Sequence, residues 1–277
     1  MTREAALLDV QTRLREAGFP ARQAEIEARQ LVEAATRSRG VRFWLERRRE
    51  LSPTERERLQ AMLARRLAGE PLQLILGSVV FFGLELGVAP GVLIPRPETE
   101  RLVELALAEL PAGPGLKVLD VGTGSGAVAL ALKHERPDLE VHASEPSEAT
   151  LRLARANARR LELEVTFHAA PFTAGLGGLD LIVSNPPYLP DTYREEAPPE
   201  LAWEAEEALY AGPEGLDVAR PLLREAYGAL RPGGGLLVEL DPGNVHALAE
   251  EARALGFGEV SVEADLAGRP RFLRARR

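Results

Sequence analysis

Leu181-Ile182-Val183-Ser184-Asn185-Pro186-Pro187-Tyr188-Leu189 is an apolar run followed at once by an asparagine, two prolines and a tyrosine. The run is typical of a buried strand, which must end at Ser184 because proline lacks the N–H that a central strand needs and fixes φ at about −65°. A rigid, extended loop then holds Asn185 and Tyr188 at the rim of the sheet. Ligands of open α/β sheets bind at this rim, at the carboxyl ends of the strands. An ordinary exit from a strand is the alternative interpretation.

A glycine-rich turn precedes this loop by about sixty residues, in Val118-Leu119-Asp120-Val121-Gly122-Thr123-Gly124-Ser125-Gly126-Ala127. Its glycines allow a tight turn and let a ligand approach where a Cβ would clash. The helix start that follows offers free N–H groups to a polar or negatively charged ligand. A dinucleotide site is the rival interpretation, but the spacing here is G-x-G-x-G and not the G-x-G-x-x-G of the dinucleotide fingerprint.

Two acidic residues lie near this turn. Asp120, inside the strand, suits a cationic ammonium group better than a pyrophosphate. Glu145 ends the second strand about twenty residues after the glycines, where a carboxylate can accept both hydroxyls of a ribose; a surface glutamate is the alternative. The combination indicates a cofactor with a ribose, an amine and a carboxylate but no phosphates. S-adenosylmethionine fits this description.

Strands and helices alternate from Lys117 onward. The expected strands are 117–121, 140–144, 164–168, 179–184, 236–240, 258–263 and 270–275, and the expected helices are 125–134, 147–161, 218–230 and 245–255. This alternation is typical of a parallel, doubly wound sheet, and we expect an antiparallel strand at its end. The sequence Pro232-Gly233-Gly234-Gly235 predicts a turn before the strand at 236–240.

The first seventy residues favour helices only. Their sharpest signal is Ser52-Pro53-Thr54-Glu55, which combines an N-cap serine, a proline at the first helical position and a glutamate three residues after the cap. Short runs rich in valine and phenylalanine at 78–88, broken by glycines, then predict a β-hairpin. The domains expected are a helical domain at 1–72, a β-hairpin linker at 73–90 and an α/β domain at 91–277.

The composition excludes several classes of protein and several kinds of site. The chain has 277 residues, 45% hydrophobic and 27% charged, as globular domains do. It has no apolar run of about 18 residues and no basic-then-apolar leader, so we expect a soluble, cytoplasmic protein without a membrane partner. The absence of cysteine excludes disulfides, cysteine-ligated zinc and thiol nucleophiles. The four histidines lack metal-ligand spacing, so we expect no metal.

Charge is divided unevenly along the chain. Residues 1–70 carry 15 arginines against 11 acidic residues, whereas the other 207 residues carry a net charge of −12. This asymmetry supports two modules and argues against the larger one gripping nucleic-acid phosphates unaided. The arginines of the first module favour a solvated face, and a docking surface for an acidic or nucleic-acid-bearing partner is the alternative. These arginines are Arg47, Arg48, Arg49, Arg56, Arg58, Arg65 and Arg66.

Three segments together resemble the HemK/PrmC methyltransferases: residues 118–127, Val183-Ser184-Asn185-Pro186-Pro187-Tyr188, and Val92-Leu93-Ile94-Pro95-Arg96-Pro97-Glu98-Thr99-Glu100. Further matches lie at 208–217, 232–234 and 265–269, so the resemblance runs from about residue 70 to the C-terminus. Asn-Pro-Pro-Tyr alone is shared with adenine and guanine amino-methyltransferases. The segment at 92–100 makes the match specific.

The resemblance implies a Rossmann-like, seven-stranded sheet in an S-adenosylmethionine-dependent methyltransferase domain at 91–277. It also implies that the small helical N-terminal domain at 1–72 recognises the substrate. It also implies methylation of the glutamine side-chain amide in the Gly-Gly-Gln motif of class 1 peptide-chain release factors, with S-adenosylmethionine as donor and S-adenosylhomocysteine as product. The implied cofactor residues are Asp120, Gly122, Thr123, Gly124, Ser125, Gly126, Glu145, Phe172 and Asn185.

Two departures from the family pattern affect the cofactor residues. Glu145 stands where the family more often has aspartate. Ala170-Pro171-Phe172 occupies a place that is usually acidic and then aromatic, so Phe172 is the expected packing surface for the cofactor base.

The loop after Ser184 suits an NH₂ group as the methyl acceptor. The oxygen of Asn185 can accept one N–H, the carbonyl of Pro186 the other, Pro187 stiffens the loop and Tyr188 offers a flat face to the substrate. Such positioning and oriented dipoles lower a barrier by several kcal/mol. Two alternatives remain at this point: an amino-methyltransferase acting on adenine or guanine in DNA or RNA, and a non-catalytic module with this fold. The negative charge of the larger module makes direct nucleic-acid binding unexpected.

Overall fold

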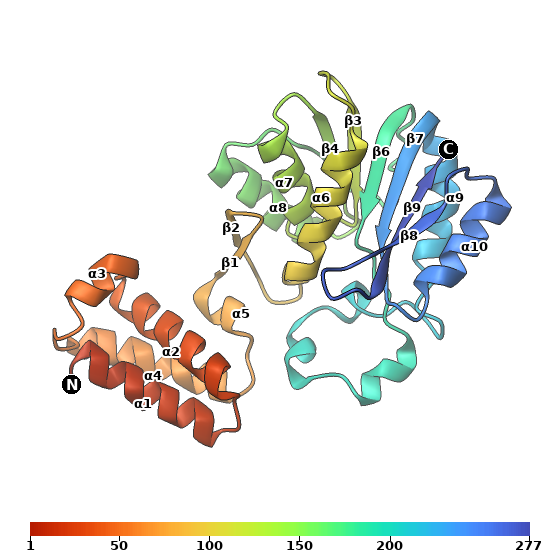
Figure 1. The fold of residues 1–277 in the computed structure, drawn as a ribbon. Helices are drawn as coiled ribbons and strands as arrows, with labels where there is room; N and C mark the ends of the chain where they lie inside the picture. The colour runs from red at the N-terminus through yellow and green to blue at the C-terminus, as the bar shows by residue number, and fades with distance from the viewer. The chain divides into compact units, whose positions relative to one another are not determined.

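The computed structural model describes residues 1–277, apart from the side chain of Pro199. The chain divides into two compact units, Met1–Gly77 and Ser78–Arg277. Figure 1 shows the first as helices only and the second as a sheet covered by helices.

Five helices make up the first unit. They are α1 Arg3–Glu16, α2 Ala21–Thr36, α3 Gly40–Leu45, α4 Pro53–Leu67 and α5 Leu72–Leu76. Apolar side chains from α1, α2, α4 and α5 form one core, which includes Val10, Leu14, Leu31, Leu63 and Ile75. The expectation of an all-helical N-terminal segment is therefore confirmed.

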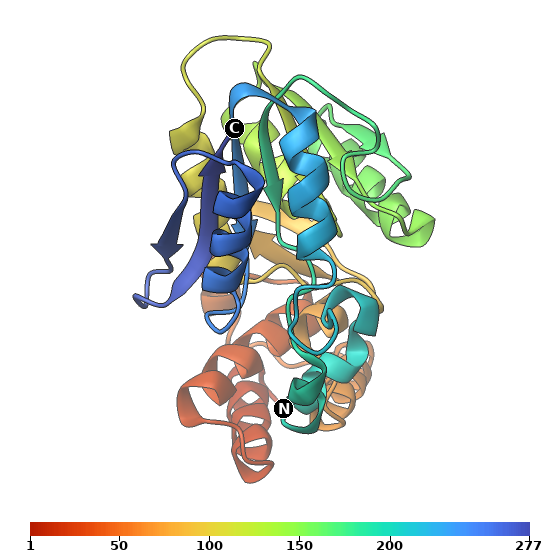
Figure 2. The same cartoon turned by 90° about the vertical axis from the view of Figure 1, so that its right-hand side faces the viewer.

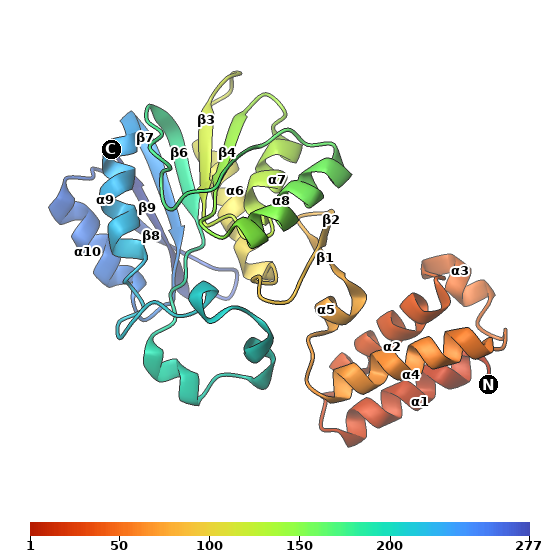
Figure 3. The same cartoon turned by 180° about the vertical axis from the view of Figure 1, so that it is seen from behind.

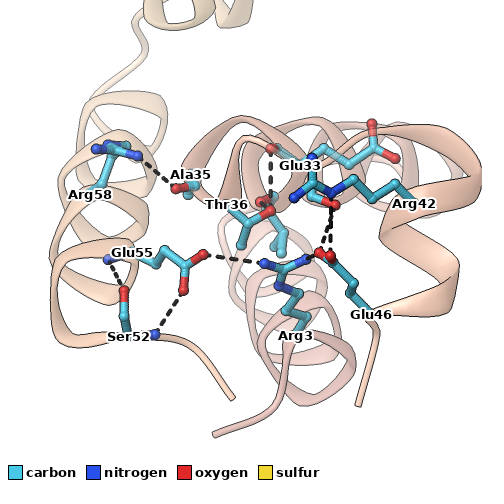
Figure 4. Close-up of polar contacts among 11 residues, drawn as sticks. Arg3, Glu33, Ala35, Thr36, Arg42, Glu46, Ser52, Glu55 and Arg58 are labelled. Atoms are coloured by element: carbon cyan, nitrogen blue, oxygen red, sulfur yellow. Dashed lines mark hydrogen bonds and ion pairs between the residues drawn. The ribbon is translucent and has the colours of Figure 1, made fainter. Parts of the chain in front are cut away.

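The start of α4 carries the expected capping box. The Ser52 hydroxyl accepts a hydrogen bond from the Glu55 N–H at 3.2 Å, and the Ser52 N–H donates to Glu55 Oε2 at 2.8 Å. The same Glu55 lies 3.3 Å from the buried guanidinium of Arg3, which also binds Glu46 (Figure 4). Arg3 thus joins α1 to the residues that begin α4 and end α3.

The arginines of this unit are not all solvated. Arg66 is buried and donates to both carboxylate oxygens of Glu27, at 2.6 and 3.1 Å. A buried bidentate pair satisfies the guanidinium where water cannot. Arg58 donates to the Ala35 carbonyl at 2.9 Å. The expectation of a solvated face is therefore wrong for Arg58 and Arg66. Helical spacing in α4 does not by itself show which of its turns face α2.

The hairpin consists of β1 Ser78–Phe81 and β2 Leu84–Gly87, paired antiparallel. Its two turn residues, Phe82 and Gly83, both have positive φ, as tight hairpin turns require. Its apolar side chains, apart from the exposed Val80, belong to the core of the second unit. Asn157 of α8 (Glu148–Leu161) bonds the Gly87 backbone. The division at Gly77 therefore differs from the expected separate linker at 73–90, since α5 packs with the first unit and the hairpin with the second.

A seven-stranded sheet forms the centre of the second unit. Its strands are β3 Lys117–Val121, β4 Glu140–Ser144, β5 Thr166–His168, β6 Leu179–Ser184, β7 Leu230–Glu239, β8 Ser261–Ala264 and β9 Pro270–Arg276. Their order is β5-β4-β3-β6-β7-β9-β8, with β3 to β7 parallel and β9 antiparallel to both of its neighbours. The expected doubly wound sheet and its closing antiparallel strand are confirmed.

Helices cover both faces of the sheet, as Figures 2 and 3 show from the side and from behind. They are α6 Glu100–Glu109, α7 Ala127–Glu135, α8 Glu148–Leu161, α9 Ala219–Ala229 and α10 Val245–Leu255. Neighbouring residues of β6 alternate between the two layers: Leu181 and Val183 pack with α6 and α7, and Ile182 packs with α9 and α10. Side chains of a strand alternate between its faces, so a strand buried on both sides reads as a continuous apolar run. None of the described helices is long and apolar enough to cross a membrane.

Residues 232–235 lie inside β7 and do not form the expected turn before it. Pairing of β6 with β7 shifts register between Leu179 and Leu181, and Gly233 has a φ of +79°. A Cβ on Gly234 would lie 2.8 Å from the Leu179 carbonyl oxygen. The glycines therefore make an irregularity within a longer strand, which local sequence cannot distinguish from a turn.

Candidate cofactor and substrate site

A cavity of about 470 Å³ opens at the carboxyl ends of β3, β4 and β6. This volume lies in the usual range for small-molecule sites. Its lining brings together the loops after these strands and the segment before α6. The residues that contribute include Val92, Thr99, Asp120, Gly122, Thr123, Gly124, Ser125, Glu145, Pro171, Phe172, Asn185, Pro186 and Pro187. Three motifs that are far apart in the sequence thus meet at one site.

The turn after β3 needs its glycines for two different reasons. Gly122 and Gly124 have φ values of +69° and +57° and line the cavity. Gly126, at φ +88°, is not among the cavity-lining residues; a Cβ there would lie 3.1 Å from Leu130 and 3.4 Å from Ala154. The first two glycines shape the cavity wall. The third permits α8 to pack closely against the start of α7.

Asp120 is buried at the carboxyl end of β3, with 2% of its surface exposed. Its Oδ2 accepts hydrogen bonds from the Thr123 hydroxyl at 2.6 Å and the Ala129 N–H at 3.1 Å. Burial raises the pKa of Asp120 to about 6, against the lowering effect of these two bonds. A positive group in the cavity would favour the ionised carboxylate.

Glu145 lines the cavity directly after β4, and both of its carboxylate oxygens bond backbone N–H groups. Oε2 accepts from Gly124 at 3.2 Å and Oε1 accepts from Ser147 at 3.0 Å. A carboxylate has about four lone-pair sites, so each oxygen can accept one further hydrogen bond. These contacts lock the carboxylate in place and leave it able to receive two hydroxyls.

Asn185 lies at the point where β6 ends, and its amide is held on one side only. Its Nδ2 donates to the Thr99 hydroxyl at 3.0 Å. Its Oδ1 is buried and has no hydrogen-bond partner among the described residues. Buried polar atoms are rarely left without a partner, so this oxygen indicates a missing donor. Asn185, Pro186 and Pro187 all line the cavity.

Tyr188 differs from the expectation that it faces the substrate, because it is not among the cavity-lining residues. Its ring packs against the core on the side of α9 and α10. Its hydroxyl accepts from Arg271 at 3.3 Å, and burial raises its pKa to about 12. Because residues after Pro187 turn inward, strand-end position alone did not predict this orientation.

Sequence reasoning did not single out Glu204 and Glu239 as functional residues. Glu204 accepts from the Ile94 N–H at 3.1 Å and pairs with Arg96, and it ties the long segment after β6 to the segment before α6. Glu239, at the end of β7, is buried, and its Oε1 lies 3.9 Å from Nη1 of Arg271. A buried-strand pattern that ends in a lone glutamate is the signal that could have identified Glu239. Glu204 has no such signal, since it lies in an irregular segment.

No group of three or more acidic or histidine side chains within the described part of the chain is placed to hold a metal ion. The charged residues that line the cavity are Asp120 and Glu145 from the cofactor loops, Arg96 from the segment before α6 and Glu207 from the segment after β6.

Comparison with known proteins gives two matching family models. Residues 5–77 match the PrmC N-terminal domain and residues 99–220 match the methyltransferase small domain. Among solved structures, a methyltransferase of Pyrococcus furiosus has a TM-score of 0.53 at 22% identity and covers 78% of this chain and 96% of that chain. A T. thermophilus 16S rRNA methyltransferase in complex with AdoMet and guanosine has a TM-score of 0.54 at 23% identity over 72% of this chain and 49% of that one. At these identities the structures confirm the fold alone.

Curated relatives are much more similar in sequence. A release factor glutamine methyltransferase of Deinococcus radiodurans is 47% identical over 272 residues, which cover 98% of this chain and 97% of that protein. Proteins of the same name from Moorella thermoacetica and Coxiella burnetii are 43% and 41% identical, each over 82% of this chain and 83% of the relative. With such identity over nearly its whole length, the chain belongs to the release factor glutamine methyltransferase family.

Proposed function

We propose that this protein transfers a methyl group from S-adenosylmethionine to the side-chain amide nitrogen of the glutamine in the Gly-Gly-Gln motif of class 1 release factors. The observation that carries the proposal is the unpartnered, buried Oδ1 of Asn185 at the cavity wall. An acceptor without a donor fits a substrate that presents an N–H at that place. We expect the enzyme to work in the cytoplasm, where translation is terminated.

The cavity suits S-adenosylmethionine group by group. Asp120 lies at the turn where an ammonium group would find a buried carboxylate, and Glu145 keeps two lone pairs for the ribose hydroxyls. Phe172 and Pro171 give an apolar wall for the base. When bound, the cofactor supplies an electrophilic sulfonium methyl group. Its positive charge also favours the ionised form of Asp120.

The loop at the end of β6 orients the substrate amide. An amide nitrogen is a poor nucleophile because its lone pair is delocalised into the carbonyl, so its reactivity depends on placement. Asn185 Oδ1 accepts one N–H of the glutamine side chain, and the Pro186 carbonyl accepts the other. These acceptors aim the nitrogen toward the cofactor methyl group, and they also favour the partial positive charge that the nitrogen gains in the transition state.

An amino-methyltransferase of nucleic acid could use the same two acceptors. Such an enzyme needs positive charge to bind phosphates, whereas residues 71–277 carry a net charge of −12. We therefore assign protein and not nucleic acid as the direct substrate. The helical unit, residues 1–77, is the part that we assign to recognition of the release factor.

Replacement of Asn185 by alanine tests the assignment. We expect Asn185→Ala to lower methyl transfer by about 10²-fold or more, because an oriented acceptor is lost, while cofactor affinity stays close to that of the wild type. The measurement is transfer of radiolabelled methyl to a release factor, to the same factor with its glutamine replaced, and to DNA or rRNA. Thr192→Ala, at an exposed position of the same segment, is the matched control. Undiminished turnover in Asn185→Ala, or label on nucleic acid, overturns the assignment.

A further inference from the structure

We infer that Asn244 and the turn at 212–215 clamp the backbone carbonyl of Tyr188, and that this clamp makes Asn244 a positioning residue for methyl transfer. The inference rests on the proposed function, in which the loop Asn185-Pro186-Pro187-Tyr188 orients the amide of the substrate glutamine. It gives a role to the segment at 208–217 and to the start of α10.

The loop after β6 depends on its two ends for its position. Pro186 and Pro187 have no N–H, so the middle of the loop cannot be held through backbone donors. Their rings also fix φ at about −65°, so a movement at one end of the loop is carried to the other. The first end is β6, where the Ser184 hydroxyl donates to the Val121 carbonyl at 2.8 Å. The second end is Tyr188, whose ring packs with the core on the side of α9 and α10.

Asn244 holds the carbonyl of this second end. It lies at the start of α10, is 7% exposed, and its Nδ2 donates to the Tyr188 carbonyl at 2.9 Å. The carbonyl oxygens of Glu214 and Gly215 lie 3.3 Å from the same nitrogen. Three carbonyls around one end of the side chain require its NH₂ group there, because an oxygen would face three acceptors. The amide therefore has one orientation, in which it links the start of α10 to the loop after β6.

The turn at 212–215 lies against the same hydrogen bond. Gly215 has a φ of +68°, and a Cβ there would lie 2.2 Å from the Tyr188 carbonyl oxygen and 2.8 Å from Asn244 Nδ2. Both separations are shorter than van der Waals contact, so the backbone of the turn can approach this closely only at a glycine. The Tyr188 carbonyl is thus enclosed by a donor and by the turn.

Backbone pairing secures the chain directly after Tyr188. The Leu189 N–H donates to the Leu209 carbonyl at 2.9 Å, and the Ala211 N–H donates to the Leu189 carbonyl at 3.0 Å. This pairing places the turn that follows Ala211 beside the loop after β6. The turn and Asn244 then fix the Tyr188 carbonyl together.

Loss of the clamp should misplace the acceptors for the substrate and leave the cofactor groups in place. Asn185 and Pro186 stand shortly before the clamped carbonyl, and the rigid prolines carry a shift of Tyr188 to them. The cofactor groups Asp120 and Glu145 belong to the ends of β3 and β4. A misplacement of about 1 Å can lower a rate by about 10²-fold. A small shift of the loop is therefore sufficient to lower kcat.

Replacement of Asn244 by alanine tests the clamp by kinetics. We expect Asn244→Ala to lower kcat by about tenfold or more, with the KM for the release factor and the Kd for S-adenosylhomocysteine changed by less than about twofold. His246→Ala, exposed in the first turn of α10, is the matched control and should keep the wild-type kcat. Both variants are assayed at a temperature at which circular dichroism shows them to be folded, so a loss of stability alone leaves kcat unchanged. A wild-type kcat in Asn244→Ala overturns the inference.

Isotope labelling reports on the clamped carbonyl directly. Of the four tyrosines, only Tyr188 is followed by a leucine. Tyrosine labelled with ¹³C at its carbonyl, combined with ¹⁵N-leucine, therefore gives a single signal in a spectrum that correlates each amide with the preceding carbonyl. We expect the ¹³C shift of Tyr188 to change in Asn244→Ala, because its carbonyl loses a hydrogen bond, and to stay unchanged in His246→Ala. An unaltered Tyr188 signal in Asn244→Ala refutes the clamp.

A second variant reaches the same contact from the turn. Gly215→Ala places a methyl group against the Tyr188 carbonyl. Gly178→Ala is its control for backbone strain, because Gly178 is exposed, has a φ of +70° and has no described atom within 4 Å of its Cβ position. We expect Gly215→Ala to shift the Tyr188 signal and lower kcat, and Gly178→Ala to do neither; equal behaviour of the two variants contradicts the clamp. If the Tyr188 signal responds to Asn244→Ala but the wild type transfers no methyl to a release factor, the proposed function fails and the clamp stands.

Discussion

Glu145 illustrates how a single residue can be structural and functional at once. Its two oxygens hold the N–H groups of Gly124 and Ser147, and these residues begin the two loops that shape the cavity wall. The same carboxylate keeps lone pairs free toward the cavity. An aspartate is one methylene shorter, so the glutamate here reaches the Gly124 N–H that belongs to the neighbouring strand's loop.

We expect Glu145→Ala to weaken cofactor binding by roughly 1.5–3 kcal/mol, which is the usual loss for hydrogen bonds to a charged group. Isothermal titration with S-adenosylhomocysteine measures it, and Glu164→Ala at an exposed position is the control. Unchanged affinity in Glu145→Ala would contradict the ribose role. A thermal denaturation curve of the same variant shows whether the loops still fold.

At the scale of the element, α4 is organised by its first turn. The Ser52–Glu55 box satisfies two N–H groups that a helix start otherwise leaves without partners. Glu55 also contacts Arg3 of α1, and its pKa is lowered: burial acts to raise it, but hydrogen bonds from Ser52 and the charges of Arg3 and Arg49 act more strongly in the opposite direction. One capping glutamate therefore serves two helices.

We expect Ser52→Ala to destabilise the helical unit by about 1 kcal/mol, since the cap loses its side-chain acceptor. Thr54→Ala, two residues later and exposed, is the matched control and should have a much smaller effect. Hydrogen exchange of the amides in the first turn of α4, together with the denaturant midpoint, measures the change. Equal effects of the two substitutions would show that the box contributes nothing beyond local helix propensity.

The whole molecule contains separate cores. The helices of residues 1–77 pack around one cluster of apolar side chains, and the sheet of residues 78–277 packs against two others, one on each face. All residues that line the cofactor cavity belong to the second unit. A ligand stabilises the part of the chain that binds it, so the two units should respond differently to the cofactor.

We expect S-adenosylhomocysteine at about 100 times its Kd to stabilise residues 78–277 by about 2.7 kcal/mol and to leave residues 1–77 unchanged. Hydrogen-exchange mass spectrometry of the full chain, with and without the ligand, measures protection in each unit. Glu145→Ala at the same ligand concentration is the control, because its smaller occupancy should reduce the protection. Equal protection of both units would mean that they unfold as one.

Much of the fold follows from local sequence. The alternation of apolar strands and helices predicted the doubly wound sheet, the box at Ser52 predicted the start of α4, and the glycine turn with Asn-Pro-Pro predicted two walls of the cavity. These features are encoded over a few residues each, by periodicity of two or 3.6 and by the special backbone of glycine and proline. The resemblance to the HemK/PrmC methyltransferases, carried by three such segments, is confirmed by relatives that span nearly the whole chain.

Only the tertiary structure decided what depends on contacts between distant segments. It turned Tyr188 away from the cavity, buried Arg66 against Glu27, joined the hairpin to the larger unit, and brought Thr99 to Asn185. Thr99 and Asn185 are 86 residues apart. No local sequence pattern indicates which side of the Asn185 amide faces the Thr99 hydroxyl. The sequence determined the kind of nitrogen that the loop can receive. The packing of the segment before α6 against the end of β6 decided how the Asn185 amide is oriented, because the Thr99 hydroxyl accepts a hydrogen bond from its NH₂ group.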